Sequence, residues 1–307
     1  MRYRRPVLET ARRLFRCWLI AGLLAAGLAL GCGRTEPPAV TSPAVPGERD
    51  PQRVISLAPS LTEMVYELGE DTRLVGVTDY CTAYRARETH ARVGTLLNPN
   101  LERIIELKPD LILAHGGTNR ERTLAQLRDL GLRVELFAED TGVASIVDKY
   151  RRVAELLGVP ERAALQVQVL QDTLAAIRTA VAAQPRVRVL CQVGTDPLVA
   201  VGAGSFLNEV IGLAGGENLT AAAASAYPRY SREAVLTLNP EVIVMVDMGN
   251  MSAAEARRWQ ALGVVSAAKS GRLHLLKAQE LCIPTPRHLA ASARRLAALF
   301  HPGVALP

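Results

Sequence analysis

The sequence predicts an α/β protein of two lobes joined by one long helix. A phrase at 101–113 recurs at 232–244, and each copy holds a glutamate, an apolar helical stripe, Leu-x-Pro-acid and an apolar run. Runs typical of strands alternate with helical runs on both sides of the chain's middle, as in parallel sheets. Between the two copies, 160–184 has no glycine, no proline after its first residue, and apolar residues spaced three and four apart, which predicts a long helix.

Each copy of the phrase predicts a short helix that ends before a proline and leads into a buried strand. Pro109 and Pro240 disfavour a helical conformation in the residue before them. The aliphatic runs that follow suit a strand covered on both faces. Two such copies, one on each side of the long helix, indicate two similar lobes.

The N-terminus predicts export rather than a folded element. Residues 1–31 hold six arginines and one glutamate, so most of the formal charge of +6 lies there and the rest of the chain is nearly neutral. The basic pI therefore gives no reason to expect a nucleic-acid partner. An uncharged apolar run over 17–31 follows the arginines, as in a secretory signal, and is short for a membrane span.

The end of this run resembles a bacterial lipoprotein signal, which makes Cys32 the lipidated first residue of the mature chain. Ala29 departs from that pattern, which prefers leucine there, and an uncleaved anchor or simple secretion stay open. The proline-rich stretch 32–52 is typical of an extended tether. We therefore expect a folded body outside the cytoplasm, lipid-anchored to a bacterial membrane.

The first lobe is predicted over 53–140. Its expected strands are 53–58, 74–78, 111–114 and 133–137, and its expected helices are 61–68, the first copy of the repeat and 120–130. Ligands of parallel sheets sit beyond the carboxyl ends of the strands. The loops that hold Tyr80, Leu96 and His115 follow strands, so we expect them on one edge.

The region 141–185 is predicted to connect the lobes. A helix over 145–157 precedes the long one, whose roughly 24 residues at 1.5 Å rise would span about 36 Å. That length suits a rigid strut between lobes, and a peripheral helix of one domain is the alternative.

The second lobe is predicted over 186–307. Its expected strands are 187–193, 198–201, 242–246 and 273–276, with helices ending near 213, over 253–261 and from 286 to about 301, and a turn at 215–218. Gly202 and Gly204 lack the remaining residues of a nucleotide-binding motif, so a turn before a helix is expected there.

Several segments in order are similar to the helical-backbone periplasmic binding proteins, the solute receptors of ABC importers for cobalamin, haem and iron-siderophores. The resemblance covers about 53–300 and is strongest to the vitamin B12-binding branch. It is carried by the segments 54–63, 74–77, 100–111, 215–218, 231–233 and 284–287.

The resemblance implies two lobes around a ligand cleft, no catalytic activity, a monomer, and a permease with ATPase subunits as partners. In the family one surface glutamate of each lobe docks onto arginines of the permease, and the matching residues are Glu102 and Glu233. An acid near a helix N-terminus is favoured electrostatically, so an ordinary helix acid is the alternative.

Cobalamin is the ligand that the resemblance implies, with haem or an iron-siderophore as alternatives. Tyr80 and Tyr227 match aromatic positions of the B12-binding branch, whereas two tryptophan positions hold Leu96 and His115. His115 is a candidate axial ligand for cobalt or haem iron. Glu280, in the loop after the last strand, is a further expected contact.

Three cysteines follow Cys32, so they allow at most one internal disulfide. Cys81 and Cys282 both lie on expected cleft loops, and a bond between them would restrain opening. Reduced thiols are the alternative.

Three other functional classes stay open. The five scattered histidines form no recognised catalytic or metal motif, which argues against an enzyme. A zinc or manganese receptor would need several cleft histidines, and only His115 is expected there. A structural lipoprotein without a solute is the third.

Overall fold

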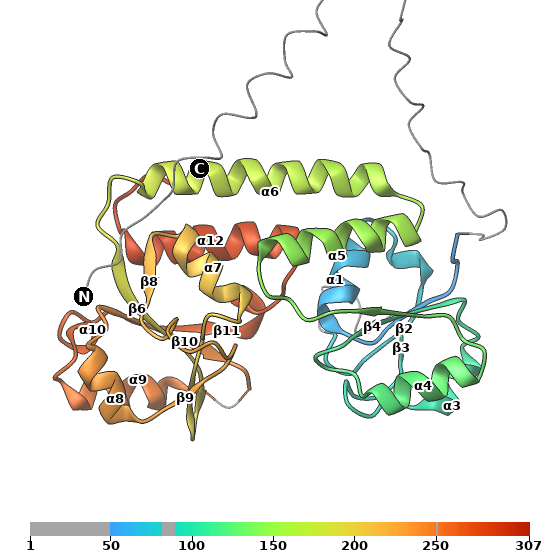
Figure 1. Cartoon of the computed structure of the whole chain (residues 1–307), viewed down its shortest axis with the longest axis horizontal. Helices are drawn as coiled ribbons and strands as arrows, with labels where there is room; N and C mark the ends of the chain where they lie inside the picture. Colours follow the sequence, from blue (N-terminus) through green and yellow to red (C-terminus); the bar gives the residue numbers. More distant parts are fainter. Residues whose placement is uncertain (1–49, 82–89, 250) are drawn as a thin grey trace, which may run out of the picture. The chain divides into compact units, whose positions relative to one another are not determined.

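A computed structural model describes residues 50–81, 90–249 and 251–307. The expected signal, Cys32 and the tether up to residue 49 lie outside these ranges. Within them, two sheets are each flanked by helices, and the long helix α6 (Pro160–Val181) runs alongside α5 (Val143–Leu156) and α12 (Pro286–Phe300) (Figure 1). The α/β class predicted from the sequence is confirmed.

The first sheet is parallel throughout, with strand order β3-β2-β1-β4-β5. Its strands are β1 (Val54–Ser56), β2 (Leu74–Val77), β3 (Ala91–Arg92), β4 (Leu111–His115) and β5 (Val134–Phe137). The accompanying helices are α1 (Pro59–Glu67), a 3-10 turn (Asp71–Arg73), α3 (Leu101–Glu106) and α4 (Glu121–Asp129).

The second sheet differs from a purely parallel one. Its order is β11-β10-β6-β7-β9, with β8 also paired to β6, and β7 runs antiparallel to β6 and β9. Only Asp196 and Pro197 separate β6 from β7, and so short a link can join only antiparallel strands. The expected turn at 215–218 is wrong, because β8 pairs with the start of β6. The strands are β6 (Val187–Thr195), β7 (Leu198–Ala200), β8 (Gly216–Asn218), β9 (Arg229–Tyr230), β10 (Val242–Asp247) and β11 (Leu273–Lys277).

The helices of the second lobe follow the expected ranges, with two short additions. They are α7 (Phe206–Leu213), α8 (Arg232–Leu238), α9 (Ala253–Leu262), α10 (Ser266–Lys269), α11 (Ala278–Leu281) and α12. The additions are α10 and α11, which are only four residues long and lack the periodicity that marks a longer helix.

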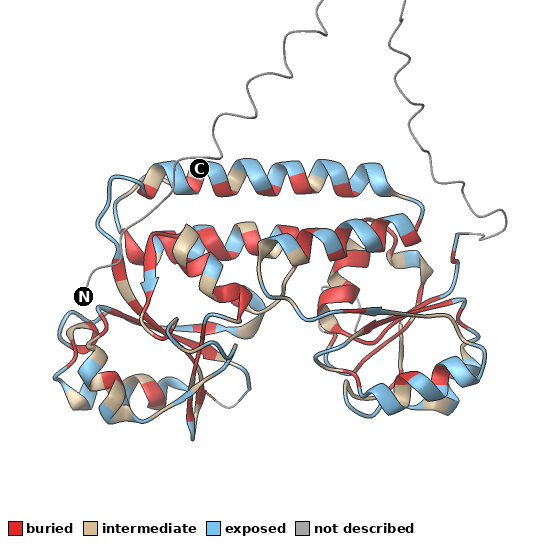
Figure 2. Cartoon of the chain, viewed as in Figure 1, coloured by how far each residue is buried: buried red, intermediate tan, exposed pale blue. Residues whose placement is uncertain are grey.

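The apolar residues of both sheets alternate between two faces. In the first sheet Leu111 and Leu113 pack on one face, and Ile112 and Ala114 on the other. The second sheet alternates in the same way, and one face of each sheet enters a single shared cluster with α1, α5, α6, α7 and α12. Figure 2 shows α6 buried along one side only, as its three-and-four spacing predicts.

The long helix contacts both lobes. Near its start, Arg162 donates to the Leu68 carbonyl and pairs with Glu70, and Gln166 donates to the Glu67 carbonyl. Further along, α6 packs against α12 and α7 of the second lobe. It is therefore a strut between lobes rather than a peripheral helix.

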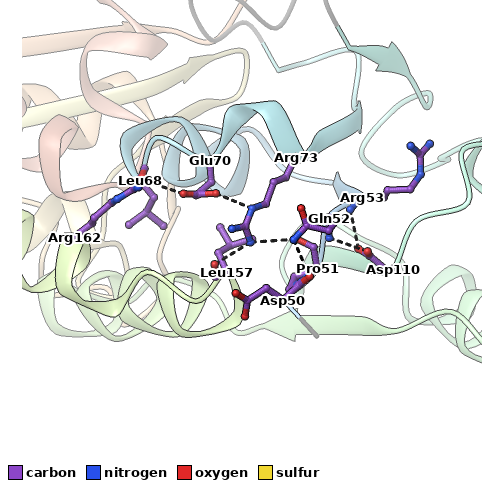
Figure 3. Close-up of polar contacts among 10 residues, drawn as sticks. All are labelled: Asp50, Pro51, Gln52, Arg53, Leu68, Glu70, Arg73, Asp110, Leu157 and Arg162. Atoms are coloured by element: carbon purple, nitrogen blue, oxygen red, sulfur yellow. Dashed lines mark hydrogen bonds and ion pairs between the residues drawn. The ribbon is translucent and has the colours of Figure 1, made fainter. Parts of the chain in front are cut away.

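The chain is fixed to the folded body from Asp50 onward (Figure 3). The backbone amides of Gln52 and Arg53 donate to the Asp110 carboxylate at 2.8 and 2.9 Å. Arg73 donates to the carbonyls of Pro51 and Leu157 and pairs with Glu70. The last residues of the expected tether are thus held by the first lobe.

The two copies of the repeated phrase fold alike. Asn100 and Ser231 cap α3 and α8 by accepting a backbone N–H three residues on. Lys108 and Asn239, each before the proline, are the two non-glycine residues with positive φ in the described chain, at 46° and 45°. The residue before each proline thus leaves the helix, through the left-handed conformation that commonly ends helices.

Candidate ligand-binding and docking site

Several large apolar side chains are exposed in loops next to strands. Tyr80 follows β2 and Met248 follows β10, and both are exposed. Leu97, beside half-buried Leu96, and Tyr227, shortly before β9, are exposed as well. Large apolar residues held in water at these edges suit a ligand with apolar faces. Met248 was not predicted, because a lone methionine after a strand carries no signal.

Tyr227 is an exposed aromatic residue whose hydroxyl is near Ser205. Burial raises the pKa of the Tyr227 hydroxyl, a hydrogen bond with Ser205 opposes this, and Cys282, Cys191 and Glu139 raise it further. Glu139 follows β5 of the first sheet. The role of Tyr227 as a cleft contact stays a prediction.

His115 ends β4 inside a polar cluster. Its Nδ1 accepts from the Gly117 amide at 3.3 Å, so the ring proton is assigned to Nε2, which lies 3.3 Å from Asp140 Oδ2. Both ring nitrogens are therefore engaged. Coordination of a metal by His115 would require it to give up one of these contacts.

Lys149 completes the cluster from α5. Its Nζ lies 2.7 Å from Asp140 Oδ1, and the two side chains are only 4% and 6% exposed. Burial lowers the pKa of Lys149, and its contact with Asp140 opposes the shift. The signal was present in the sequence, because Lys149 stands on the buried stripe of α5 between Ile146 and Val153.

Asn119 ties three segments of this edge together. Its Oδ1 accepts from the His115 amide at 2.7 Å, while its Nδ2 donates to the carbonyls of Leu57 and Leu96. Leu96 and His115, expected together on one edge, are thus joined through a buried amide. Sequence reasoning gave Asn119 no role.

Glu280 has a local structural role. Its Oε1 accepts from the Lys277 amide at 2.9 Å and so caps α11, and its Oε2 lies 4.0 Å from Arg295. A carboxylate used as a cap is less available to a ligand than the sequence suggested.

The disulfide considered between Cys81 and Cys282 does not form. Cys81, Cys191 and Cys282 are free thiols. Cys81 Sγ lies 3.0 Å from Thr62 Oγ1 and 3.2 Å from Thr78 Oγ1 in the first lobe. Cys282 lies near Cys191 of β6 instead, and burial raises the pKa of Cys282 to about 12.

Glu102 and Glu233 occupy equivalent exposed positions. Each is the second residue of its helix, two places after the capping side chain. The pKa of Glu233 is lowered by its own backbone amide, by Ser231 and by Arg232. Both carboxylates thus face water at the positive end of a helix and are available to a cationic partner.

Among the described residues, no group of three or more histidine, cysteine, aspartate or glutamate side chains is placed to hold a metal ion. No helix within the same ranges is both long and apolar enough to cross a membrane.

Known proteins match this chain over most of its length. Residues 54–280 match the family model described as periplasmic binding protein. The vitamin B12-binding protein of Yersinia pestis is 33% identical over 248 residues, which is 76% of this chain and 88% of that protein. The one from Salmonella paratyphi A is 36% identical over 193 residues, 63% of this chain and 71% of the relative.

Solved structures agree with this match. The periplasmic vitamin B12-binding protein of Vibrio cholerae has a TM-score of 0.71 and 30% identity, covering 82% of this chain and 97% of that one. A periplasmic haem-binding protein from Pseudomonas aeruginosa has a TM-score of 0.73 and 28% identity, covering 83% and 94%. With its two lobes joined by α6 and a family match from β1 into α11, this chain is a member of the periplasmic binding protein family, whose members bind solutes rather than catalyse reactions.

Proposed function

We propose that this protein is the extracytoplasmic receptor of an ABC importer and captures cobalamin between its two lobes. One observation carries the proposal: the match to vitamin B12-binding proteins spans 88% of the Yersinia pestis protein at 33% identity. The exposed apolar residues at the strand ends support it, since a corrin ring presents large faces to such side chains.

Haem is the second candidate ligand. It is favoured by the likeness to the Pseudomonas aeruginosa haem-binding protein, at 28% identity. Against it, both nitrogens of His115 are engaged, so this histidine offers no free ligand to haem iron. A ferric siderophore is a third candidate without an observation of its own.

Calorimetric titration of the chain from residue 32 onward with cyanocobalamin, haemin and a ferric siderophore tests the ligand. We expect saturable binding of cyanocobalamin, weakened about tenfold by Tyr80→Ala or Tyr227→Ala, since each removes an aromatic contact of about 1.4 kcal/mol. Leu130→Ala, an exposed apolar residue just after α4, is the matched control and should bind normally. Tight binding of haemin alone would replace cobalamin by haem, and binding of none of the three would remove the receptor proposal.

We further propose that Glu102 and Glu233 dock onto basic pockets of the permease. Their support is the equivalence of the two positions and the fact that neither carboxylate forms an ion pair with another described residue. One exposed acid on each lobe complements a partner that offers one basic pocket to each.

Lipid anchoring through Cys32 is likewise proposed from the sequence. Growth with a clickable palmitate analogue should label the wild-type protein and leave Cys32→Ser unlabelled. Equal labelling of both proteins would contradict the anchor.

A further inference from the structure

Below the exposed start of α8 lies a buried polar network. Its centre is Glu255, the third residue of α9, whose side chain is only 2% exposed. Glu255 Oε1 lies 2.7 Å from Arg232 Nη2 and accepts from Gln192 Nε2 at 2.8 Å. A carboxylate this deeply buried needs a fixed counter-charge, which Arg232 supplies.

The network continues into the second sheet. Gln192, fully buried on β6, accepts from the Trp259 indole at 2.8 Å and also donates to the Gly194 carbonyl. The Arg232 guanidinium carbon lies 5.0 Å from the centroid of the Trp259 ring. Arg232 is thus held by charge, hydrogen bond and ring contact at once.

Arg232 directly precedes Glu233 in the first turn of α8. The helix has only seven residues, and the Ser231 cap and the fully buried Val235 also hold it on the second lobe. The first copy of the repeat has Leu101 in place of Arg232, and Leu101 packs against the apolar cluster of the first lobe. Both helices bury the equivalent residue, Ile104 or Val235, but their first residues make different contacts, apolar for Leu101 and ionic for Arg232.

Both copies of the repeat place an arginine next to the exposed acid. Arg103 follows Glu102 and pairs with Glu106 at 2.9 Å, whereas Arg232 precedes Glu233 and pairs with the buried Glu255. Unless compensated, the Arg232 charge would weaken the field that Glu233 presents to a basic partner. Glu255 compensates this charge from the buried side. Glu233, which has no ion-pair partner among the described residues, is then the acid that α8 presents at its surface.

From these contacts we infer that Arg232, through its pairing with Glu255, is a positioning residue for Glu233. The pair anchors the first turn of α8 on the sheet and balances the arginine charge beside the docking acid. This inference rests on the proposed docking of Glu233 to the permease.

The test uses surface plasmon resonance to measure how variants of the chain from residue 32 onward associate with the permease complex in nanodiscs. The ligand affinity of each variant is measured in parallel by titration. Glu255→Gln should leave ligand affinity within about twofold and weaken association about tenfold, the loss of one well-placed charge contact. Arg232→Leu with Glu255→Gln, which imitates the first copy, should restore association to within about threefold of wild type.

Arg258 provides a matched control, because it contacts the same Glu255 carboxylate but does not belong to α8. Arg258 lies 3.5 Å from Glu255 Oε2, is 63% exposed and belongs to α9. Arg258→Gln should associate normally. Trp259 is the sole tryptophan after residue 31, so its fluorescence reports directly on the network in each variant.

Two outcomes overturn the inference. One is normal association of Glu255→Gln, and the other is a double variant as weak as Glu255→Gln or weaker, which would make the pair ordinary structural support. Glu233→Ala distinguishes failure of the docking proposal from failure of this inference. If Glu233→Ala associates normally, Glu233 does not dock, whatever the other variants do.

Discussion

Lys149 and Asp140 form an ion pair that is almost completely buried, with Nζ 2.7 Å from Oδ1. Asp140→Asn should lower the free energy of unfolding at pH 7 by about 3 kcal/mol, because it leaves a buried ammonium without its counter-charge. Urea unfolding measures this. Combining Asp140→Asn with Lys149→Met should recover most of the loss, since no charge then remains buried.

The same variant has a defined pH dependence. Burial lowers the pKa of Lys149 in the folded protein, and loss of Asp140 removes the contact that opposes this. Between the folded and unfolded pKa values the unfolded chain binds more protons, so stability rises with pH. The deficit of Asp140→Asn should therefore shrink from pH 7 to pH 10, and a constant deficit would contradict this account.

For Glu63 on α1, we expect the opposite dependence: its contribution to stability falls as pH rises in the acidic range. Burial raises the pKa of Glu63, and the nearby charge of Glu67 raises it further. The charges of His288 and Arg287 oppose this rise. The folded state then binds more protons than the unfolded state above pH 4.5, so this contribution to stability is lost as pH rises through the folded pKa.

Glu63→Gln removes that contribution. Its melting temperature relative to wild type should be higher at pH 7 than at pH 4, as measured by calorimetry across this range. An equal offset for Glu63→Gln at both pH values would count against the raised pKa.

Thr285, at the start of α12, is bound to Glu67 of α1. Its hydroxyl donates to Glu67 Oε1 at 2.5 Å, and the Glu67 side chain is 4% exposed. Thr285→Val should lower the free energy of unfolding by about 2–3 kcal/mol, since a buried carboxylate loses a donor and α12 loses its cap. Thr285→Ser keeps the hydroxyl and should lose less than about 1 kcal/mol. Similar losses in both would show that the hydroxyl is not what matters.

Glu102→Ala combined with Glu233→Ala should abolish uptake of the ligand by whole cells while leaving its binding intact. The two acids lie on separate lobes, so each single variant should retain part of the transport. Ligand titration and an uptake assay measure the two effects. Full uptake by the double variant would reduce the repeated phrase to a feature of the fold.

The repeat shows how far local sequence reaches. Its caps, its helices and its departure from the helix before each proline follow from residues within a few positions of one another. The equivalent long-range contacts of the two copies do not follow from nearby residues. The amides of Arg53 and Arg188, far away in sequence, bind the acids Asp110 and Glu241 that close the two copies.

The candidate site divides in the same way. Sequence placed Tyr80, Leu96 and His115 after strands of a parallel sheet, because strand polarity alone sends these loops to one edge. It assigned His115 no partner, since Asp140 and Lys149 reach the imidazole from a different loop and helix.

By itself the sequence determined the α/β class, the two lobes, the long helix between them and the paired exposed acids, because periodicity and helix capping are local. Only the tertiary structure decided that β7 is antiparallel, that the thiols stay free and that Glu255 lies under α8. Those features depend on which distant side chains meet, and no local pattern of residues fixes that.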